Sequence, residues 1–123
     1  MVRKWSTALS GKPTVLYEKS LRSGQNVSFD GNVVILGDVN AGAEVVATGH
    51  ILVMGALRGL VHAGARGDED ATVTALNFAP TQLRIASHIT RPPDDTEGNG
   101  NKPPETARIK DDMVVIEEYQ PPR

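Results

Sequence analysis

Histidines and clustered carboxylates are the residues of this sequence that could perform catalysis or hold a metal ion. The three histidines, His50, His62 and His88, stand far apart and show no metal-ligand spacing. The acidic runs at 68–70 and 94–95 lie in polar segments, where clustered charges are usually solvated. We therefore expect no catalytic residue, no cofactor and no metal site, and a protein that is not an enzyme.

The glycines recur at short spacings that could suggest a phosphate-binding loop. Such a loop also needs a Lys-Ser/Thr pair and a following helix, and the sequence offers neither. The glycines belong instead to a six-residue repeat, in which they stand at Gly31, Gly37, Gly49 and Gly55. An aliphatic residue opens every unit, at Leu21, Val27, Val33, Val39, Val45, Ile51 and Leu57. A short fixed period of this kind is typical of a solenoid.

The repeat predicts an all-β fold, a three-sided β-helix. Six residues make one short strand and a corner, three such units close a triangular coil, and coils stack at about 4.8 Å. Because side chains alternate along a strand, the first and third residues of each unit should point inward. The third residues are Ser23, Phe29, Ile35, Ala41, Ala47, Val53 and Gly59, and most of them are small or apolar. We expect these two sets to form the interior.

The second and fourth residues should then face outward, and the three outer faces differ. One face is apolar, and Leu76 should continue it after the repeat; its residues are Val34, Leu36, Leu52, Met54 and Leu76. A second face is polar and rich in glycine, with Arg22, Gly24, Asn40, Gly42, Arg58 and Leu60. A contiguous apolar patch usually marks an interface. The sequence therefore predicts a homodimer through the five residues of the apolar face.

The chain is expected to form one small domain between two polar segments. We interpret residues 1–15 as a linker or tail, 16–90 as the β-helix, 91–106 as a flexible loop, and 107–123 as closing strands and tail. The loop, rich in Pro, Gly, Asn and acids, should not be needed for partner binding. A net charge of −2 gives no support for nucleic-acid binding. No apolar run approaches the ~18 residues of a membrane span.

The period slips after Ala63. The segment 73–76 resembles 51–54 at an offset of 22 instead of 18, which indicates four residues inserted into the polar loop that precedes it. A further strand is expected at 82–86 by alternation. The last apolar segments, 107–110 and 113–117, should pair as a hairpin that turns at Asp111-Asp112. Such a hairpin would cover the open end of the coil, which exposed strand edges require.

Four segments of the sequence resemble the C-terminal domain of the bacterial septum-site protein MinC. They are Arg22-Ser23-Gly24-Gln25, Gly42-Ala43-Glu44 with Gly49 behind it, Gly55-Ala56-Leu57-Arg58-Gly59, and Ala63-Gly64-Ala65-Arg66-Gly67-Asp68. The resemblance covers roughly 21–89 and is most specific in the Arg-Ser-Gly-Gln run. Two features depart from the family pattern: Leu60 stands where some relatives carry a basic residue, and the loop at 94–102 is longer and more polar.

The resemblance implies a right-handed β-helix that dimerises through one hydrophobic face. It implies binding to the membrane-associated ATPase MinD, so that the protein is cytoplasmic and reaches the inner face of the membrane only through MinD. It also implies antagonism of FtsZ polymerisation, in which a separate N-terminal domain is the main inhibitor, and so a fragment of a longer protein. The expected MinD contact lies on the polar face, at Arg22, Ser23, Gly24, Gln25, Asn40, Gly42 and Arg58.

Two other classes of β-helix protein are alternatives. The main alternative is a self-assembling structural protein of the bactofilin type, which has similar repeats but does not need the Arg-Ser-Gly-Gln run. A discrete dimer would favour the division regulator, and large polymers would favour the structural protein. Hexad acyltransferases, with His62 or His88 as the base, are the less favoured class, because the array is short and no conjugate-binding extension follows.

Overall fold

The computed structural model describes residues 12–91 and 103–121, and every regular element in these ranges is a β-strand. The strands are β1 (Thr14–Tyr17), β2 (Asn26–Phe29), β3 (Asn32–Ile35), β4 (Glu44–Ala47), β5 (Ile51–Leu57), β6 (Leu60–Ala63), β7 (Val73–Phe78), β8 (Gln82–Ile85), β9 (His88–Thr90), β10 (Glu105–Lys110) and β11 (Met113–Glu118). Within these ranges no helix is long and apolar enough to span a membrane.

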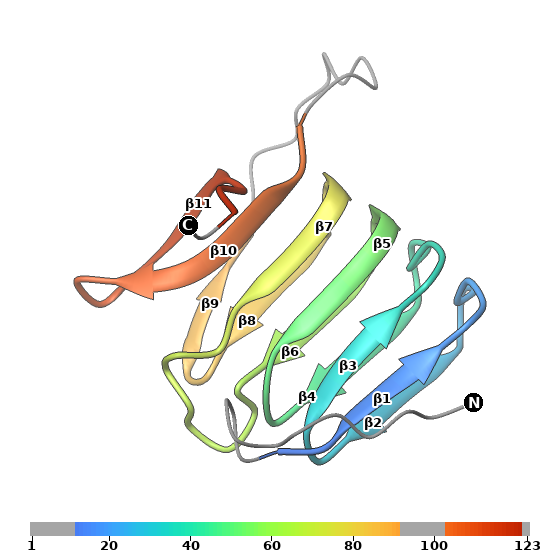
Figure 1. Cartoon of the computed structure of the whole chain (residues 1–123), viewed down its shortest axis with the longest axis horizontal. Helices are drawn as coiled ribbons and strands as arrows, with labels where there is room; N and C mark the ends of the chain where they lie inside the picture. The colour runs from blue at the N-terminus through green and yellow to red at the C-terminus, as the bar shows by residue number, and fades with distance from the viewer. Residues whose placement is uncertain (1–11, 92–102, 122–123) are drawn as a thin grey trace.

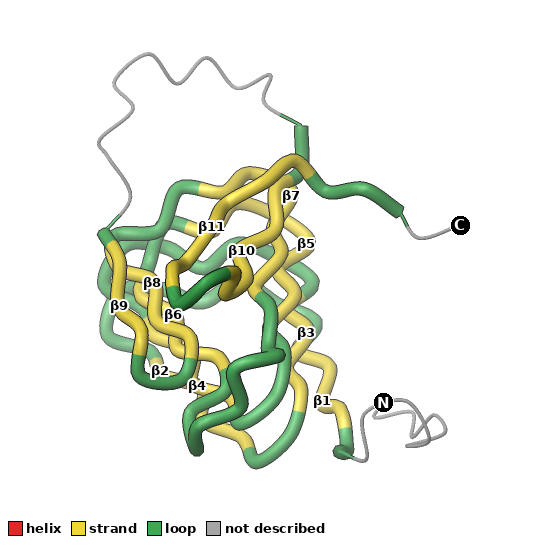
Figure 2. Tube along the Cα trace, turned by 90° about the vertical axis from the view of Figure 1, so that its left-hand side faces the viewer, coloured by secondary structure: helices red, strands yellow, loops and turns green. Residues whose placement is uncertain are grey.

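The strands form a three-sided β-helix, as the repeat predicts. One side is a six-stranded sheet in the order β1-β3-β5-β7-β10-β11, and another is a five-stranded sheet in the order β2-β4-β6-β8-β9 (Figure 1). The third side has only single-residue bridges, which join Leu21 to Val39 and Val39 to Leu57. Figure 2, turned by 90°, shows the two sheets on opposite sides of the molecule.

The interior is aliphatic, and the opening residues of all seven units are at most 4% exposed. Ile35, Ala47 and Val53, which are third residues, are buried as predicted. Ser23 and Ala41 were expected inside as well, but both are exposed. The reason is local: on the third side the chain makes a tight turn after one inward residue, so its next side chains point into solvent.

The repeat period already shortens at Gly59, whereas the sequence predicted the first irregularity after Ala63. Leu60 pairs with Glu44 and Val61 with Val45, so the path from β4 to β6 is two residues shorter than the path from β2 to β4. Gly59 permits this short path, because a Cβ there would lie 2.7 Å from the Asn40 carbonyl oxygen of the coil below. Leu60 therefore belongs to β6 and not to the polar face, and His62 lies in the same strand.

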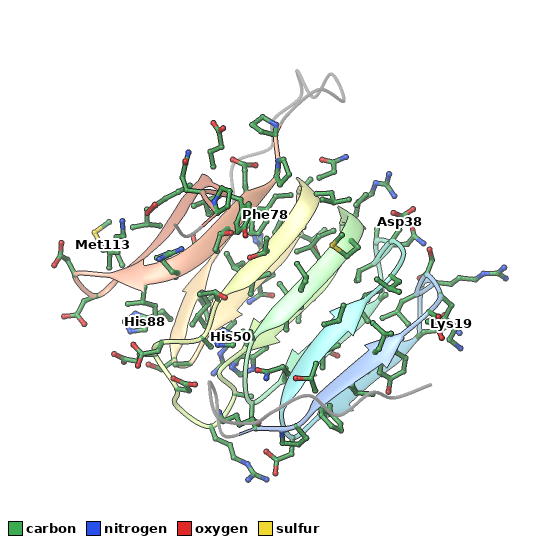
Figure 3. The ribbon with its side chains drawn as sticks, in the orientation of Figure 1. Lys19, Asp38, His50, Phe78, His88 and Met113 are labelled. Atoms are coloured by element: carbon green, nitrogen blue, oxygen red, sulfur yellow. The ribbon has the colours of Figure 1, made fainter. Side chains whose placement is uncertain are left out.

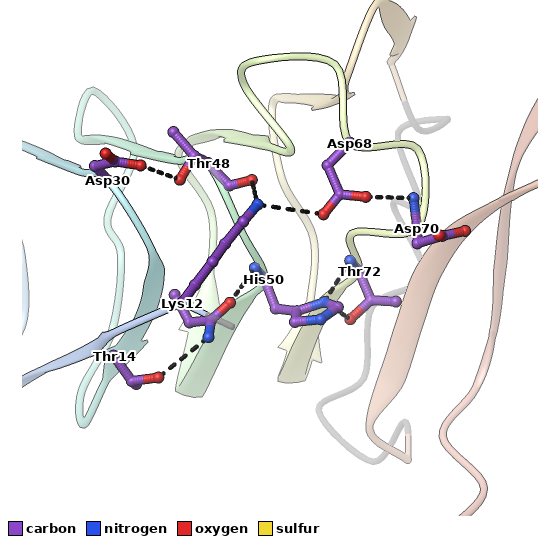
Figure 4. A network of polar contacts seen from close by, with 9 residues as sticks. Lys12, Thr14, Asp30, Thr48, His50, Asp68, Asp70 and Thr72 are labelled. Carbon is purple, nitrogen blue, oxygen red and sulfur yellow. Dashed lines mark hydrogen bonds and ion pairs between the residues drawn. The ribbon is translucent and has the colours of Figure 1, made fainter. Parts of the chain in front are cut away.

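The loop before β7 contains the predicted insertion. Ile51 pairs with Val73, as the longer offset in the sequence predicts, and Val61 pairs with Leu83 across the same insertion. Lys12, ahead of β1, connects to this loop, since its Nζ lies 3.4 Å from Asp68 Oδ2 and donates to the Thr48 carbonyl at 2.9 Å (Figure 4).

Polar side chains at one corner connect successive coils. The Asn32 amide donates to Thr14 Oγ1 at 3.1 Å, and Asn32 Oδ1 accepts the backbone N–H of His50 at 2.8 Å. The Thr72 N–H donates to His50 Nδ1 at 3.0 Å, so the neutral ring carries its proton on Nε2 (Figure 4). This row of Thr14, Asn32, His50 and Thr72 satisfies backbone and side-chain groups across four coils.

Two antiparallel hairpins end the stack. β9, which the sequence did not reveal, folds back and pairs antiparallel with β8. In the other sheet, β10 pairs antiparallel with β7. The predicted hairpin β10–β11 is confirmed, and Asp111 and Asp112 take positive φ values of 51° and 62° at its turn. β1 starts at Thr14, within the last residues of the expected linker at 1–15. Most of the expected linker and of the expected flexible loop lies outside the described residues.

Replacing Leu83 by alanine should lower the free energy of unfolding by about 2–5 kcal/mol, because it leaves a cavity at a side chain that is fully buried. Replacing its neighbour Arg84, which is exposed, should change stability by less than about 0.5 kcal/mol. Urea unfolding followed by circular dichroism measures both values. Similar losses in the two variants would contradict the inward direction of Leu83.

Candidate functional site

The third side of the β-helix brings together the polar residues singled out from the sequence. Because Leu21, Val39 and Leu57 stack directly, the residues that follow them, Arg22, Asn40 and Arg58, form one outward row, as expected. Both arginines are exposed, and Asn40 is half-buried. Leu60 was also expected on this surface but lies in β6, so the other residues of the predicted polar face found here are Gly24 and Gly42.

Two stacked turns shape this surface. In the first, the Gln25 N–H donates to the Arg22 carbonyl at 2.9 Å; in the second, the Ala43 N–H donates to the Asn40 carbonyl at 2.9 Å. Gly24 and Gly42 occupy the third position of their turns with φ of +88° and +87°, close to the value of about +80° that a type II turn requires there. The Gly24 N–H donates to the Gly42 carbonyl at 2.9 Å, which joins the two turns.

Side-chain hydrogen bonds fix the positions of several of these residues. Gln25 Oε1 accepts the backbone N–H of Arg22 at 2.8 Å, so Gln25 closes its own turn. The Asn40 amide donates to the Leu21 carbonyl at 2.9 Å, and Asn40 Oδ1 accepts from Arg58 at 3.1 Å. The side chains of Gln25 and Asn40 therefore hold the shape of the surface, and these hydrogen bonds leave them less available to bind a partner.

Arg22 and Arg58 give this surface exposed positive charge. Among the described residues, no carboxylate forms an ion pair with Arg22 or Arg58. A guanidinium can make bidentate, charge-assisted hydrogen bonds to a carboxylate. The exposed glycines leave room for a partner backbone to approach closely. These features suit a protein partner with acidic residues.

The outer face of the six-stranded sheet is the apolar surface predicted from the sequence. Leu36, Met54 and Leu76 are 42%, 44% and 43% exposed, and Val34 and Leu52 are half-buried beside them. Leu16 extends this surface, since it pairs in register with Val34. Leu16 was not among the residues predicted for this face, although it stands one full coil of the repeat before Val34.

The three histidines lie in different parts of the fold and have different partners. His50 belongs to the polar row at the corner, and His62 Nε2 lies 3.0 Å from the Ala86 carbonyl. His88 lies 3.4 Å from Glu69 Oε2, and the ligand atoms of Glu69, His88 and Asp112 all lie within 4.8 Å of one another. Sequence spacing could not reveal this cluster, because its members come from three separate segments. The two carboxylates are exposed, and the cluster consists of the His88–Glu69 contact and an additional acid at the surface.

The comparisons with known proteins agree with this arrangement. The family model described as the C-terminal domain of the septum formation inhibitor MinC matches residues 15–119. A probable septum site-determining protein MinC of Acetivibrio thermocellus is 63% identical over 110 residues, which are 89% of this chain and 48% of that protein. The corresponding protein of Heliobacterium modesticaldum is 62% identical over 106 residues, 86% of this chain and 36% of that protein. The chain thus spans about half the length of these relatives, or less.

A solved structure gives the same fold. The chain resembles a chain of the MinC:MinD cell division protein complex of Aquifex aeolicus with a TM-score of 0.81 and 37% sequence identity. The match covers 89% of this chain and 88% of that one.

Alanine in place of Gly24 or Gly42 should destabilise the two turns to different extents. Gly24→Ala should lower the free energy of unfolding by about 1–2 kcal/mol, because alanine is strained in the left-handed backbone conformation at this position. The space around the added methyl group is open. Gly42→Ala should cost roughly 1 kcal/mol more, because its Cβ would also lie 3.0 Å from Ser23 Cβ. Chemical denaturation of both variants provides the test, and equal losses would argue against the stacked-turn geometry.

Proposed function

Because this chain belongs to the family of the C-terminal domain of the septum formation inhibitor MinC, we propose that it is the dimeric, MinD-binding part of a regulator of division-site placement. In this role it is not an enzyme. Binding to the MinD ATPase brings it to the inner face of the cell membrane. There it helps to antagonise FtsZ assembly at the wrong sites.

The likeness to a chain of a MinC:MinD complex is the observation that carries the MinD assignment. The polar third side supplies a matching surface, with the exposed Arg22 and Arg58 beside two turns whose glycines are also exposed. The proposed contact comprises Arg22, Ser23, Gly24, Gln25, Asn40, Gly42 and Arg58. Within it, we propose that Gln25 and Asn40, whose side chains form hydrogen bonds within the surface, shape it, and that the two arginines contact the partner directly.

The proposed dimer uses the outer face of the six-stranded sheet, through Val34, Leu36, Leu52, Met54 and Leu76, with Leu16 added. Three side chains with almost equal exposure form a row: Leu36 directly after β3, Met54 in β5 and Leu76 in β7. A surface of this kind, free of charge along its centre, favours burial against a copy of itself. The antiparallel hairpin at the C-terminal end of the stack favours a closed dimer over the filament of the bactofilin-type alternative.

Leu52→Asp should convert the dimer to a monomer, because it places an unpaired charge within the apolar interface. We expect the dissociation constant to rise at least roughly a hundredfold, which corresponds to about 2.7 kcal/mol. Light scattering over a dilution series measures the mass. Val46→Asp is the matched control, since Val46 is half-buried on the outer face of the other sheet and should leave the dimer intact. A Leu52→Asp protein that remains dimeric rules out this interface.

Arg22→Ala should weaken binding to ATP-loaded MinD by about 1–3 kcal/mol, as expected for an interface hot spot, and should leave dimerisation unchanged. Co-sedimentation with MinD and lipid vesicles, with and without ATP, measures this. Arg84→Ala removes an exposed arginine from the other sheet and serves as the control. Gly42→Asp should also reduce binding when it is measured well below its lowered melting temperature. If neither Arg22→Ala nor Gly42→Asp changes the affinity, the site lies elsewhere.

A further inference from the structure

The strand β11 has one edge that no described strand pairs with, since it ends the order of the six-stranded sheet. The Tyr119 N–H, just after β11, donates to the Pro104 carbonyl at 2.8 Å, on the β10 side. Because backbone groups alternate along a strand, the N–H and C=O groups of Val114, Ile116 and Glu118 point to the opposite, open side. Within the described part of the chain, no strand pairs with this side of β11, and β9 approaches β11 without pairing with it.

The middle of β11 is apolar and only partly covered. Val114 and Ile116 pack against the core but remain half-buried, whereas Val73 and Ala75 in the same sheet are fully buried. Figure 3 shows Met113 at the tip of the hairpin, away from the coils, and it is 66% exposed. An additional strand beside β11 would cover Val114 and Ile116 and complete the end of the core.

Both ends of this edge are acidic. Glu105 and Glu118 are direct cross-strand partners, and like charges in this position destabilise the pair. Among the described residues, no lysine or arginine forms an ion pair with either of them. At the other end, the Asp112 carboxylate lies within 4.8 Å of ligand atoms of Glu69 and His88.

The lysine of the hairpin does not neutralise these acids. Lys110 Nζ lies 2.6 Å from Glu117 Oε1, and this hydrogen bond lowers the pKa of the Glu117 carboxyl. A second copy of β11 is a poor partner for the edge, because antiparallel pairing would place Glu118 of one copy close to Asp112 of the other. A cationic strand would relieve the repulsion at both ends.

We propose that the open edge of β11 binds an extended, cationic segment of another polypeptide by strand addition, separately from the surfaces assigned to MinD and to the dimer. Its backbone pairs with Val114, Ile116 and Glu118. Apolar side chains at alternate positions cover Val114 and Ile116, and a basic residue at each end meets the acids at 105/118 and at 111–112. Strand addition combines backbone hydrogen bonds for affinity with alternate side chains for specificity.

The test uses the full chain, labelled with ¹⁵N, and a blocked heptapeptide, Lys-Thr-Val-Thr-Val-Thr-Lys. Its two lysines and two valines lie on one face of an extended strand. Titration followed by NMR should shift the amides of Val114, Ile116 and Glu118. The same peptide with glutamate at both ends should bind at least roughly tenfold more weakly, and Glu118→Gln should weaken the lysine peptide about two- to fivefold. Glu44→Gln, on the other sheet, should leave the affinity unchanged.

Two N-methylated peptides separate strand addition from simple charge attraction. Methyl groups on both valine nitrogens block one edge of the peptide, and methyl groups on the second and third threonine nitrogens block the other. One of these peptides should lose binding and the other should retain it. Equal binding of both, equal binding of the glutamate peptide, or shifts that map away from β11 would each overturn the proposal.

Discussion

The structure depends on parallel backbone hydrogen bonding between residues one coil apart. Thr14 to Tyr17 pair with Asn32 to Ile35, and Asn26 to Phe29 pair with Glu44 to Ala47 at the same offset. This register places like side chains on top of one another, so a single choice of residue type is repeated through the stack. The buried aliphatic rows, the row of Thr14, Asn32, His50 and Thr72, and the outward row of arginines and Asn40 all follow from it. The two proposed binding surfaces are therefore products of the same register that forms the core.

Departures from this register occur at corners, where they leave the strands intact. The path between paired strands becomes shorter at Gly59 and longer across the loop at 64–70. Each change alters which outward residues are neighbours. The short path at Gly59 removes Leu60 from the polar face and leaves Arg58 at the end of its row. The long loop places Asp68 within reach of Lys12 and Glu69 near His88.

The strands and the apolar surface could be predicted because the aliphatic residues that form them recur at fixed intervals in the sequence. The aliphatic residues that open each unit, such as Val33 and Ile51, recur both at the short repeat of one unit and at the longer repeat of one coil. The β10–β11 turn is marked by two aspartates between apolar runs. Ser23 and Ala41 were misplaced because we expected the third residue of every six-residue unit to point inward, which requires a strand on all three sides. The third side is instead a tight turn, which is marked in the sequence only by its glycines. Leu60 was misplaced because a short deletion in a corner leaves the aliphatic pattern almost unchanged. Strand β9 and the Glu69–His88–Asp112 cluster depend on chain reversal at Ala86, which no local pattern in this sequence indicates.

The contact of Lys12 with the loop at 64–70 has a consequence for how the domain unfolds. In a stack of coils, each coil normally touches only its neighbours, so the terminal coil can detach while the rest stays folded. Lys12 precedes the first strand, yet it bonds to Thr48 and Asp68, which belong to later coils. Detachment of the first coil must therefore break contacts with later coils as well. The antiparallel hairpins protect the other end of the stack, so fraying from both ends is opposed, and the short solenoid should unfold in a cooperative transition instead of coil by coil.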